Sequence, residues 1–172
     1  MSQPEKYDLV VLGMFIAWSL GSQGKRSAVV ERRYVGGSYP NIACLPSKNV
    51  FQSAKVVSYF HRGGEFGITT GAWKVEMTAV RDRKRKMVDG LIASHLEKYR
   101  QNNAELVMGE GRFVGPKTIE VVATDGATCT LRGENVVIST GSRARIDPIA
   151  GLAEARPMTR IEALELDRVP NP

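Results

Sequence analysis

The chain has 172 residues, of which 42% are hydrophobic, 7% aromatic and 24% charged, and these proportions exclude wholesale disorder and a low-complexity chain. The net charge is +6, but only residues 81–86 are densely basic, and because no aromatic side chain interrupts them we interpret this run as a solvated helix face and expect no nucleic-acid partner. Two distant cysteines and two isolated histidines provide neither a disulfide framework nor metal ligands, which favours a cytoplasmic protein without a bound metal.

The first third of the chain predicts a strand, a helix and a second strand. Residues 7–13 are typical of a buried parallel strand that ends in glycine, and residues 14–20 have a helical composition. Residues 27–31 form a short apolar strand that ends in Glu31. This order, with an acid at the tip of the second strand, indicates a βαβ unit.

The apolar stretch over residues 9–20 is shorter than the about 20 residues that a bilayer requires. The segment before it contains Glu5, Lys6 and Asp8 and carries no net positive charge. We therefore expect neither a membrane span nor a secretion signal.

Two helical segments follow a loop at residues 36–48. Residues 49–60 place apolar side chains at spacings of three and four, and Gly63-Gly64 ends this helix. Residues 77–103 repeat the pattern over a longer stretch whose polar face carries the basic run.

After the second helix the pattern changes to short strands. Strands are predicted at residues 106–108, 112–114, 119–123, 129–131 and 136–138. Asp125-Gly126 predicts a hairpin turn in which both central positions need positive φ. We expect an antiparallel hairpin or meander over residues 106–132, with Cys129 in an edge strand, and an extended tail over residues 146–172.

These elements predict one α/β domain over residues 1–172. We expect a mostly parallel sheet with helices on both faces, into which the small antiparallel meander is inserted.

Six sequence blocks resemble, in this order, the N-terminal FAD domain of the pyridine nucleotide-disulfide oxidoreductases, which include dihydrolipoamide dehydrogenase and mercuric reductase-like members. The blocks are Tyr7–Gly13, Val29–Arg32, Gly36-Gly37, Cys44–Lys48, Gly111–Pro116 and Val136–Gly141. The block Cys44-Leu45-Pro46-Ser47-Lys48, with the Gly-Gly pair before it, is specific. The resemblance implies a Rossmann-like FAD-binding domain of a flavoprotein oxidoreductase.

The resemblance also implies which residues would hold FAD. In the family a G-x-G-x-x-G turn brings backbone N–H groups to the pyrophosphate, and the acid after the second strand binds the ribose. The implied cofactor-binding residues are Gly13, Glu31, Arg32, Gly36, Gly37, Ser47, Thr140 and Gly141, and the implied catalytic residues are Cys44 and Lys48. The residues themselves leave alternatives open: Glu31 as a surface acid, Thr140-Gly141 as a tight turn, and Cys44 as a buried, inert thiol.

The chain departs from the family at the glycine-rich turn. Met14, Phe15 and Ile16 follow Gly13, and the segment that leads to Glu31 is about five residues shorter than the family pattern. Bulky side chains prevent the close approach of backbone to phosphate that glycine allows. We therefore predict that the βαβ fold persists, that the pyrophosphate site fails and that FAD binds weakly.

The redox loop departs as well. The family carries C-x-x-x-x-C; Cys44 matches the second cysteine, but Tyr39 stands at the first, so no disulfide can form within the loop. Cys44 precedes a helix whose positive amino terminus favours a thiolate, and Lys48 lies one turn further on.

The 172 residues contain neither the family's nicotinamide-binding domain nor its dimerisation domain. The resemblance therefore implies a truncated, degenerate homologue that is unable to complete electron transfer from NAD(P)H to a disulfide alone. One alternative is a non-catalytic assembly module that forms a homodimer or docks on a partner reductase chain through exposed apolar surface. A second is a pocket that has been reused for other chemistry at Cys44.

Overall fold

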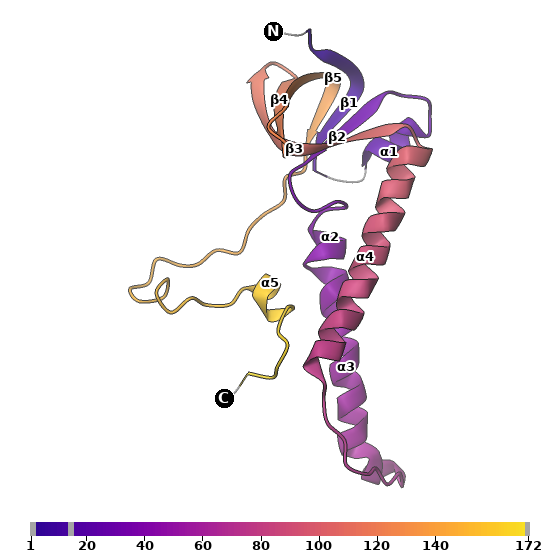
Figure 1. Cartoon of the computed structure of the whole chain (residues 1–172), viewed down its shortest axis with the longest axis vertical. Coiled ribbons are helices and arrows are strands. Elements are labelled where there is room, and N and C mark those ends of the chain that lie inside the picture. Colours follow the sequence, from indigo (N-terminus) through magenta and orange to yellow (C-terminus); the bar gives the residue numbers. More distant parts are fainter. Residues whose placement is uncertain (1–2, 14–15, 171–172) are drawn as a thin grey trace. The chain divides into compact units, whose positions relative to one another are not determined.

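The computed structural model describes residues 3–13 and 16–170 (Figure 1). The contacts within the chain divide it into two compact units. Unit 1 comprises Met1–Asn41 and Leu91–Ser142, and unit 2 comprises Ile42–Gly90 and Arg143–Pro172. Helix α4 (Met77–Gln101) contributes residues to both.

Unit 1 contains five strands that pair in a closed ring (Figure 1). They are β1 (Glu5–Leu12), β2 (Ser27–Glu31), β3 (Ala104–Gly115), β4 (Thr118–Ala123) and β5 (Thr128–Ile138). β1 pairs in parallel with β2 and β5, and β2 pairs in parallel with β3. β4 pairs antiparallel with β3 and β5. The predicted α/β fold, a mostly parallel sheet with a small antiparallel meander, is confirmed.

Strands β3 and β5 are each longer than the separate short strands predicted from the sequence. β3 pairs with β2 as far as Met108 and then with β4 from Gly109 onward. Glycine is required at this change of partner, because a Cβ at Gly109 would lie 2.5 Å from the Val122 carbonyl oxygen. Such glycines interrupt the apolar pattern without ending the strand. β5 lies between β4 and β1, so the prediction that Cys129 occupies an edge strand is wrong.

Alternate side chains of β1 and β2 fill two apolar clusters on the two faces of the sheet. On one face Leu9, Val11 and Val29 pack with Ala17 of helix α1 (Ile16–Gly21) and Tyr99 of α4. On the other face Val10, Leu12, Ala28 and Val30 pack with Ile119, Val121 and Leu131 of β4 and β5. Strands rather than helices cover this second face, which corrects the expectation of helices on both faces.

Helix α1 is shorter than most crossover helices in βαβ units. It has six residues and ends at Gly21, where a Cβ would lie 2.0 Å from the Asn102 carbonyl oxygen. The Ser27 hydroxyl donates to the Ala17 carbonyl at 2.8 Å and ties the helix to β2. The helix was predicted over residues 14–20; Met14 and Phe15 lie outside the described residues.

The turn between β4 and β5 contains Asp125-Gly126, as predicted, but only one of the two residues has positive φ. Gly126 has φ of +86°, whereas Asp125 is not among the residues with positive φ. The Asp125 carboxylate instead accepts the Ala127 N–H at 2.9 Å, and the Gly126 N–H donates to the Ala123 carbonyl at 3.0 Å. The side chain of Asp125 therefore stabilises a turn that does not need two left-handed residues.

Unit 2 is built from helix α3 (Cys44–Arg62), a short 3-10 helix η1 (Gly63–Phe66), the first half of α4 and a tail that contains α5 (Arg160–Ala163). Helix α3 begins five residues before the predicted start, because Pro46 is tolerated within the first turn. The Arg83 guanidinium of α4 donates to the Ser53 hydroxyl of α3 at 2.8 Å, so the two helices lie side by side here. Among the described residues no helix is long and apolar enough to cross a membrane.

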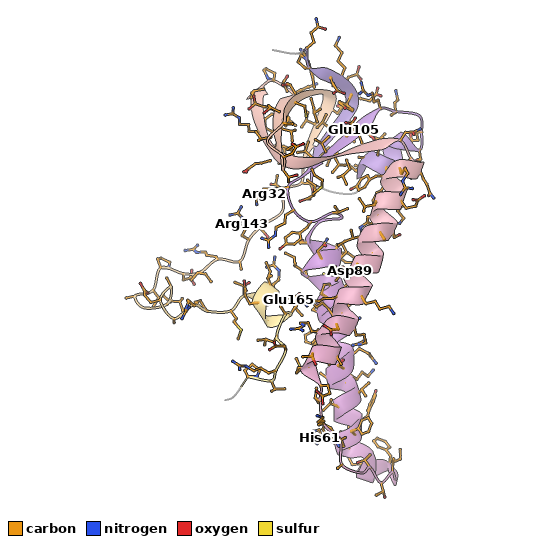
Figure 2. All side chains as sticks on the ribbon, in the orientation of Figure 1. Arg32, His61, Asp89, Glu105, Arg143 and Glu165 are labelled. Atoms are coloured by element: carbon orange, nitrogen blue, oxygen red, sulfur yellow. The ribbon has the colours of Figure 1, made fainter. Side chains whose placement is uncertain are left out.

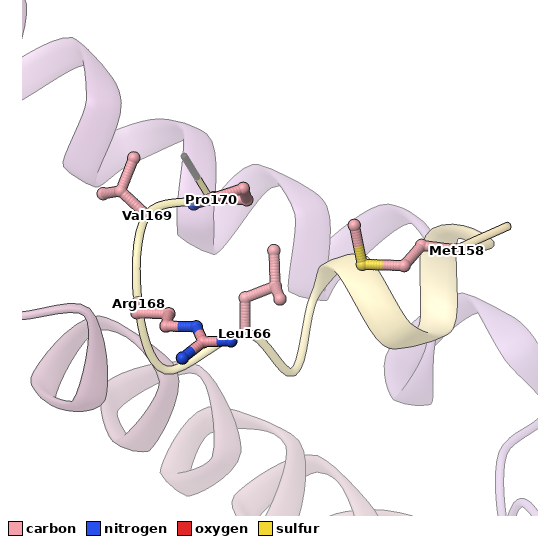
Figure 3. Close-up of a pocket in the computed structure, with 5 residues that line it drawn as sticks. All are labelled: Met158, Leu166, Arg168, Val169 and Pro170. Carbon is pink, nitrogen blue, oxygen red and sulfur yellow. The ribbon is translucent and has the colours of Figure 1, made fainter. Parts of the chain in front are cut away.

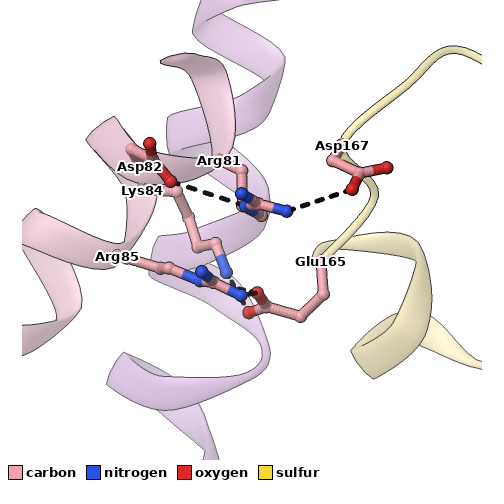
Figure 4. Close-up of polar contacts among 6 residues, drawn as sticks. All are labelled: Arg81, Asp82, Lys84, Arg85, Glu165 and Asp167. Carbon is pink, nitrogen blue, oxygen red and sulfur yellow. Dashed lines mark hydrogen bonds and ion pairs between the residues drawn. The ribbon is translucent and has the colours of Figure 1, made fainter. Parts of the chain in front are cut away.

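The basic run of α4 is only partly a solvated face, which corrects the interpretation made from the sequence: Arg83 and Lys86 are exposed, but Lys84 is buried. Lys84 has a side chain only 2% exposed and forms an ion pair with Glu165 of the tail (Figure 4). Arg85 pairs with the same carboxylate at 2.8 Å, and Arg81 approaches Asp167 at 3.5 Å. Burial raises the pKa of the Glu165 carboxyl, but the hydrogen bonds from Lys84 and Arg85 together outweigh burial and hold this pKa below its ordinary value. We name Arg81, Lys84, Arg85, Glu165 and Asp167 the basic clasp.

We predict that Glu165→Gln destabilises the protein by about 2–3 kcal/mol in urea unfolding, because it leaves the buried Lys84 ammonium without its counter-charge. The loss is smaller than the about 3–5 kcal/mol expected for a fully buried pair, since Glu165 is 42% exposed. Adding Lys84→Met, which replaces the ammonium by an apolar chain, restores most of the loss. Glu97→Gln, which removes the exposed partner of Arg100, costs less than about 1 kcal/mol. Equal effects of Glu165→Gln and Glu97→Gln would contradict the buried clasp.

Candidate functional site

Gly13 lies where the carboxyl ends of β1, β2 and β5 meet in unit 1. Its N–H donates to the Val30 carbonyl at 3.1 Å, while the Ser139 N–H donates to the Leu12 carbonyl at 2.7 Å. Gly13 has φ of +124°, and a Cβ at this position would lie 2.1 Å from the Ser139 carbonyl oxygen. Only glycine fits here, so the three strand ends are held together by main chain.

Glu31 ends β2 and organises the turn that follows. Its Oε1 accepts the N–H groups of Arg33 and Tyr34, at 2.8 and 3.0 Å. Arg32 is exposed and lies 3.5 Å from the Glu110 carboxylate of β3 (Figure 2). One carboxylate oxygen of Glu31 is therefore already engaged with the backbone, while the other accepts no hydrogen bond from the described residues.

The Gly36-Gly37 loop is held by side chains that the sequence analysis did not select. The Asn41 amide of α2 (Ser38–Asn41) donates to the carbonyls of Val35 and Gly37, at 2.8 and 2.7 Å. Both glycines have positive φ, and a Cβ at Gly36 would lie 2.1 Å from Nδ1 of His95.

His95 is a buried residue of α4, and its ring lies 5.5 Å from that of Trp18. Burial, and then the nearby Lys98 ammonium, lower the pKa of its imidazole below the ordinary value of 6.5. In the sequence His95 is an isolated histidine within a predicted helix. Asn41 comes four residues after the Gly36-Gly37 pair and belongs to no recognised motif. Neither signal was sufficient to predict the packing of this loop.

Thr140 and Gly141 follow β5 directly, on the segment that Ser139 ties to Leu12. Both are exposed, Gly141 has φ of +71°, and a Cβ at Gly141 would meet nothing within 4 Å. Unit 1 therefore brings Gly13, Glu31 and the Thr140-Gly141 turn to the carboxyl ends of the parallel strands, the end at which ligands bind in α/β sheets.

Cys44, Ser47 and Lys48 belong to unit 2. Cys44 begins α3 and is exposed, so the alternative of a buried thiol is wrong. The Ser47 hydroxyl donates to the Cys44 carbonyl at 3.0 Å, and Lys48 is exposed. In unit 1 Tyr39, the residue at the family's first cysteine position, is 46% exposed. Burial, followed by Glu5 and Glu105, raises the pKa of the other thiol, Cys129.

Unit 2 also contains a hollow beside α5. It is lined by Met158, Leu166, Arg168, Val169 and Pro170 (Figure 3). Arg168 is the one titratable group in this lining, so the hollow offers little for acid–base or nucleophilic chemistry. In the part of the chain that the structure describes, no three metal-type ligands lie close enough to hold an ion.

We predict that Gly13→Ala lowers the free energy of unfolding by about 3 kcal/mol or more, because the new Cβ overlaps the Ser139 carbonyl and φ is strained. Gly141→Ala is the matched control: it also has positive φ but open space, and is expected to cost about 1 kcal/mol. Thermal unfolding followed by circular dichroism measures both. If the two substitutions cost the same, the strand ends are not joined as described.

Comparisons with known proteins identify relatives of the chain. The chain is 32% identical, over 174 residues, to the dihydrolipoyl dehydrogenase of Mycoplasma pneumoniae, and the match covers 95% of this chain but 37% of that protein. Among solved structures, LpdA from Mycobacterium tuberculosis superposes with a TM-score of 0.79 and 19% identity, covering 95% of this chain and 38% of that one. The flavoprotein disulfide reductase RclA from Escherichia coli gives 0.72 and 21%, covering 95% and 35%.

The chain therefore spans little more than a third of the length of these relatives. The family model for pyridine nucleotide-disulphide oxidoreductases matches residues 12–171. This match includes the strand ends at Gly13, the turn at Glu31 and the segment after β5. The chain is thus a member of the pyridine nucleotide-disulphide oxidoreductase family.

Proposed function

We propose that this chain is an FAD-type domain in which the pyrophosphate contact is lost, so that FAD binds weakly. The observation that carries the proposal is the connection after β1. Three residues separate Leu12 from Ile16, the first residue of α1, and Gly13 is the one glycine among them. A dinucleotide turn needs further glycines so that the backbone can approach both phosphates.

The residues of this connection do not fit a pyrophosphate. The side chains of Met14, Phe15 and Ile16 have no hydrogen-bond donor for a phosphate. Only backbone N–H groups could donate from this connection. Ile16 is 48% exposed at the start of a six-residue helix, and Gly13 already donates its N–H to Val30. We propose that the neighbouring groups, Glu31 and the Thr140-Gly141 turn, are what remains of the residues that contact the adenosine and flavin parts of FAD in the family.

We propose that these 172 residues do not by themselves transfer electrons from NAD(P)H to a disulfide. Such transfer needs a thiol pair, whereas Tyr39 stands where the partner of Cys44 would be, and a phenol cannot form a disulfide. The relatives are almost three times as long as the matched segment. Within this chain Cys44 is an exposed single thiol at the start of α3. Its nearest cation in the sequence is Lys48, one turn further along the helix.

We predict that the protein purifies almost free of flavin. The visible absorbance band of oxidised flavin should be far below one flavin per chain, even after incubation with excess FAD and gel filtration. Heat release of bound flavin and its fluorescence provide an independent count. A stoichiometric flavin band after gel filtration would contradict the proposal.

A second function, a non-catalytic assembly module, is favoured by exposed aromatic side chains on α3. Phe51 and Tyr59 are 69% and 55% exposed, and their spacing of eight residues places them on one side of the helix. Exposed apolar side chains that gather on one face are typical of protein–protein contacts. We propose that this face binds a second copy of the chain or a partner reductase.

We predict that light scattering detects self-association at high protein concentration and that Phe51→Ser with Tyr59→Ser abolishes it. Ile149→Ser, which removes an equally exposed apolar side chain from the tail, is the control and should leave association unchanged. A monomer at every concentration tested, for the unsubstituted protein, would remove homodimerisation as a function.

A further inference from the structure

A shallow hollow of unit 1 lies at the amino-terminal end of β1. It is lined by Lys6, Tyr7, Asp8, Arg26, Lys117, Arg132, Gly133 and Glu134. Gly13 lies at the other end of the same strand, about 20 Å away at the rise of a β-strand. The hollow is therefore separate from the candidate site described above, and no step of the proposed function uses it.

Two cations of the hollow are neighbours in the sheet. Lys6 of β1 and Arg132 of β5 are register partners in the parallel pairing of these strands, and both are exposed. Side chains at the same register of adjacent strands project on the same face. Like charges in this position repel each other, so the arrangement is stabilised by an anion placed between them.

The carboxylates at the hollow do not neutralise these two cations. Asp8 accepts the backbone N–H of Arg26 at 2.7 Å and lies 3.8 Å from the Lys25 ammonium. Glu134 is exposed, and its carbonyl accepts from Lys117 at 2.7 Å. Within residues 3–13 and 16–170, neither Lys6 nor Arg132 takes part in an ion pair.

The other two cations are held in place by the backbone and by neighbouring side chains. The Arg26 guanidinium donates to the Lys6 carbonyl at 3.0 Å and pairs with Glu5 at 2.9 Å. Lys117 has φ of +54°, which is unfavourable for any residue except glycine, and its carbonyl accepts the Gly133 N–H at 3.1 Å. Lys117 thus occupies a turn position where glycine would be less strained, and the Glu134 carbonyl holds its ammonium beside β5.

We propose that this hollow binds a small phosphate-type dianion, either inorganic phosphate or the phosphate group of a small metabolite. Arg132 supplies a planar fork that matches a phosphate, and Lys6 supplies a compact charge next to it. Lys117 contributes the third charge from the turn before β4. Four cations against two carboxylates leave a surplus of two positive charges, which a dianion balances.

The test is a titration of the whole protein with sodium phosphate at constant ionic strength, followed by the backbone amide signals of residues 6, 117 and 132–134 in proton–nitrogen correlation spectra. A parallel titration with glycerol phosphate distinguishes a phosphate monoester from free phosphate, and sodium chloride controls for simple screening. The variant is Lys6→Gln with Arg132→Gln. The control is Lys55→Gln with Lys86→Gln, which removes the same charge from exposed positions of unit 2.

We expect saturable shifts at these amides with at least one of the two phosphates, and an affinity about tenfold lower in the Lys6/Arg132 variant, the loss expected for two ion pairs. The control variant should bind as the unsubstituted protein does. The spectra of each variant in the absence of phosphate report whether it is folded. Shifts that do not saturate, shifts centred elsewhere, or equal affinity in both variants would overturn the proposal.

Discussion

The structure of unit 1 depends on the junction at Gly13. Two backbone hydrogen bonds, from Gly13 to Val30 and from Ser139 to Leu12, join the ends of three strands. A side chain at Gly13 would lie within 2.1 Å of a carbonyl oxygen, so the junction requires glycine even without a cofactor. Because this requirement is structural, the first glycine of the family's turn is expected to remain after the glycines that serve the phosphates have gone. The proposed loss of cofactor contacts is then compatible with the persistence of the fold.

Each unit contains a cluster of cations, and the two clusters differ in whether carboxylates face them. In unit 2 the basic clasp joins α4 to the tail through Lys84, whose burial makes its counter-charge necessary. In unit 1 the pairing of Lys6 with Arg132 brings like charges together without a carboxylate between them. The net charge of +6 thus includes a cluster whose three cations face two carboxylates, and a pair of cations that has no carboxylate partner among the described residues.

Much of the fold could be predicted from the sequence, since apolar runs such as residues 7–13 and the helical period of residues 77–103 reflect local preferences. What could not be predicted depends on partners distant in sequence. β3 and β5 both continue through glycines. Along its length β3 passes from pairing with β2 to pairing with β4, and β5 passes from β4 to β1. Lys84 is buried, and its counter-charge is Glu165, 81 positions later in the sequence. At the candidate site the motifs selected Gly13, Glu31 and Thr140-Gly141 at the carboxyl ends of the parallel strands. The Asn41 and His95 contacts that hold the Gly36-Gly37 loop have no motif.

We propose that the short connection after Gly13 weakens dinucleotide binding on an otherwise retained βαβ unit. The most direct test of this proposal is a fluorescence titration of FAD against the protein and against a variant in which a G-x-G-x-x-G turn of family length replaces residues 13–18. We expect only weak binding of FAD by the unsubstituted chain and a clear gain of affinity in the variant. Tight, stoichiometric binding of FAD by the unsubstituted chain would contradict it.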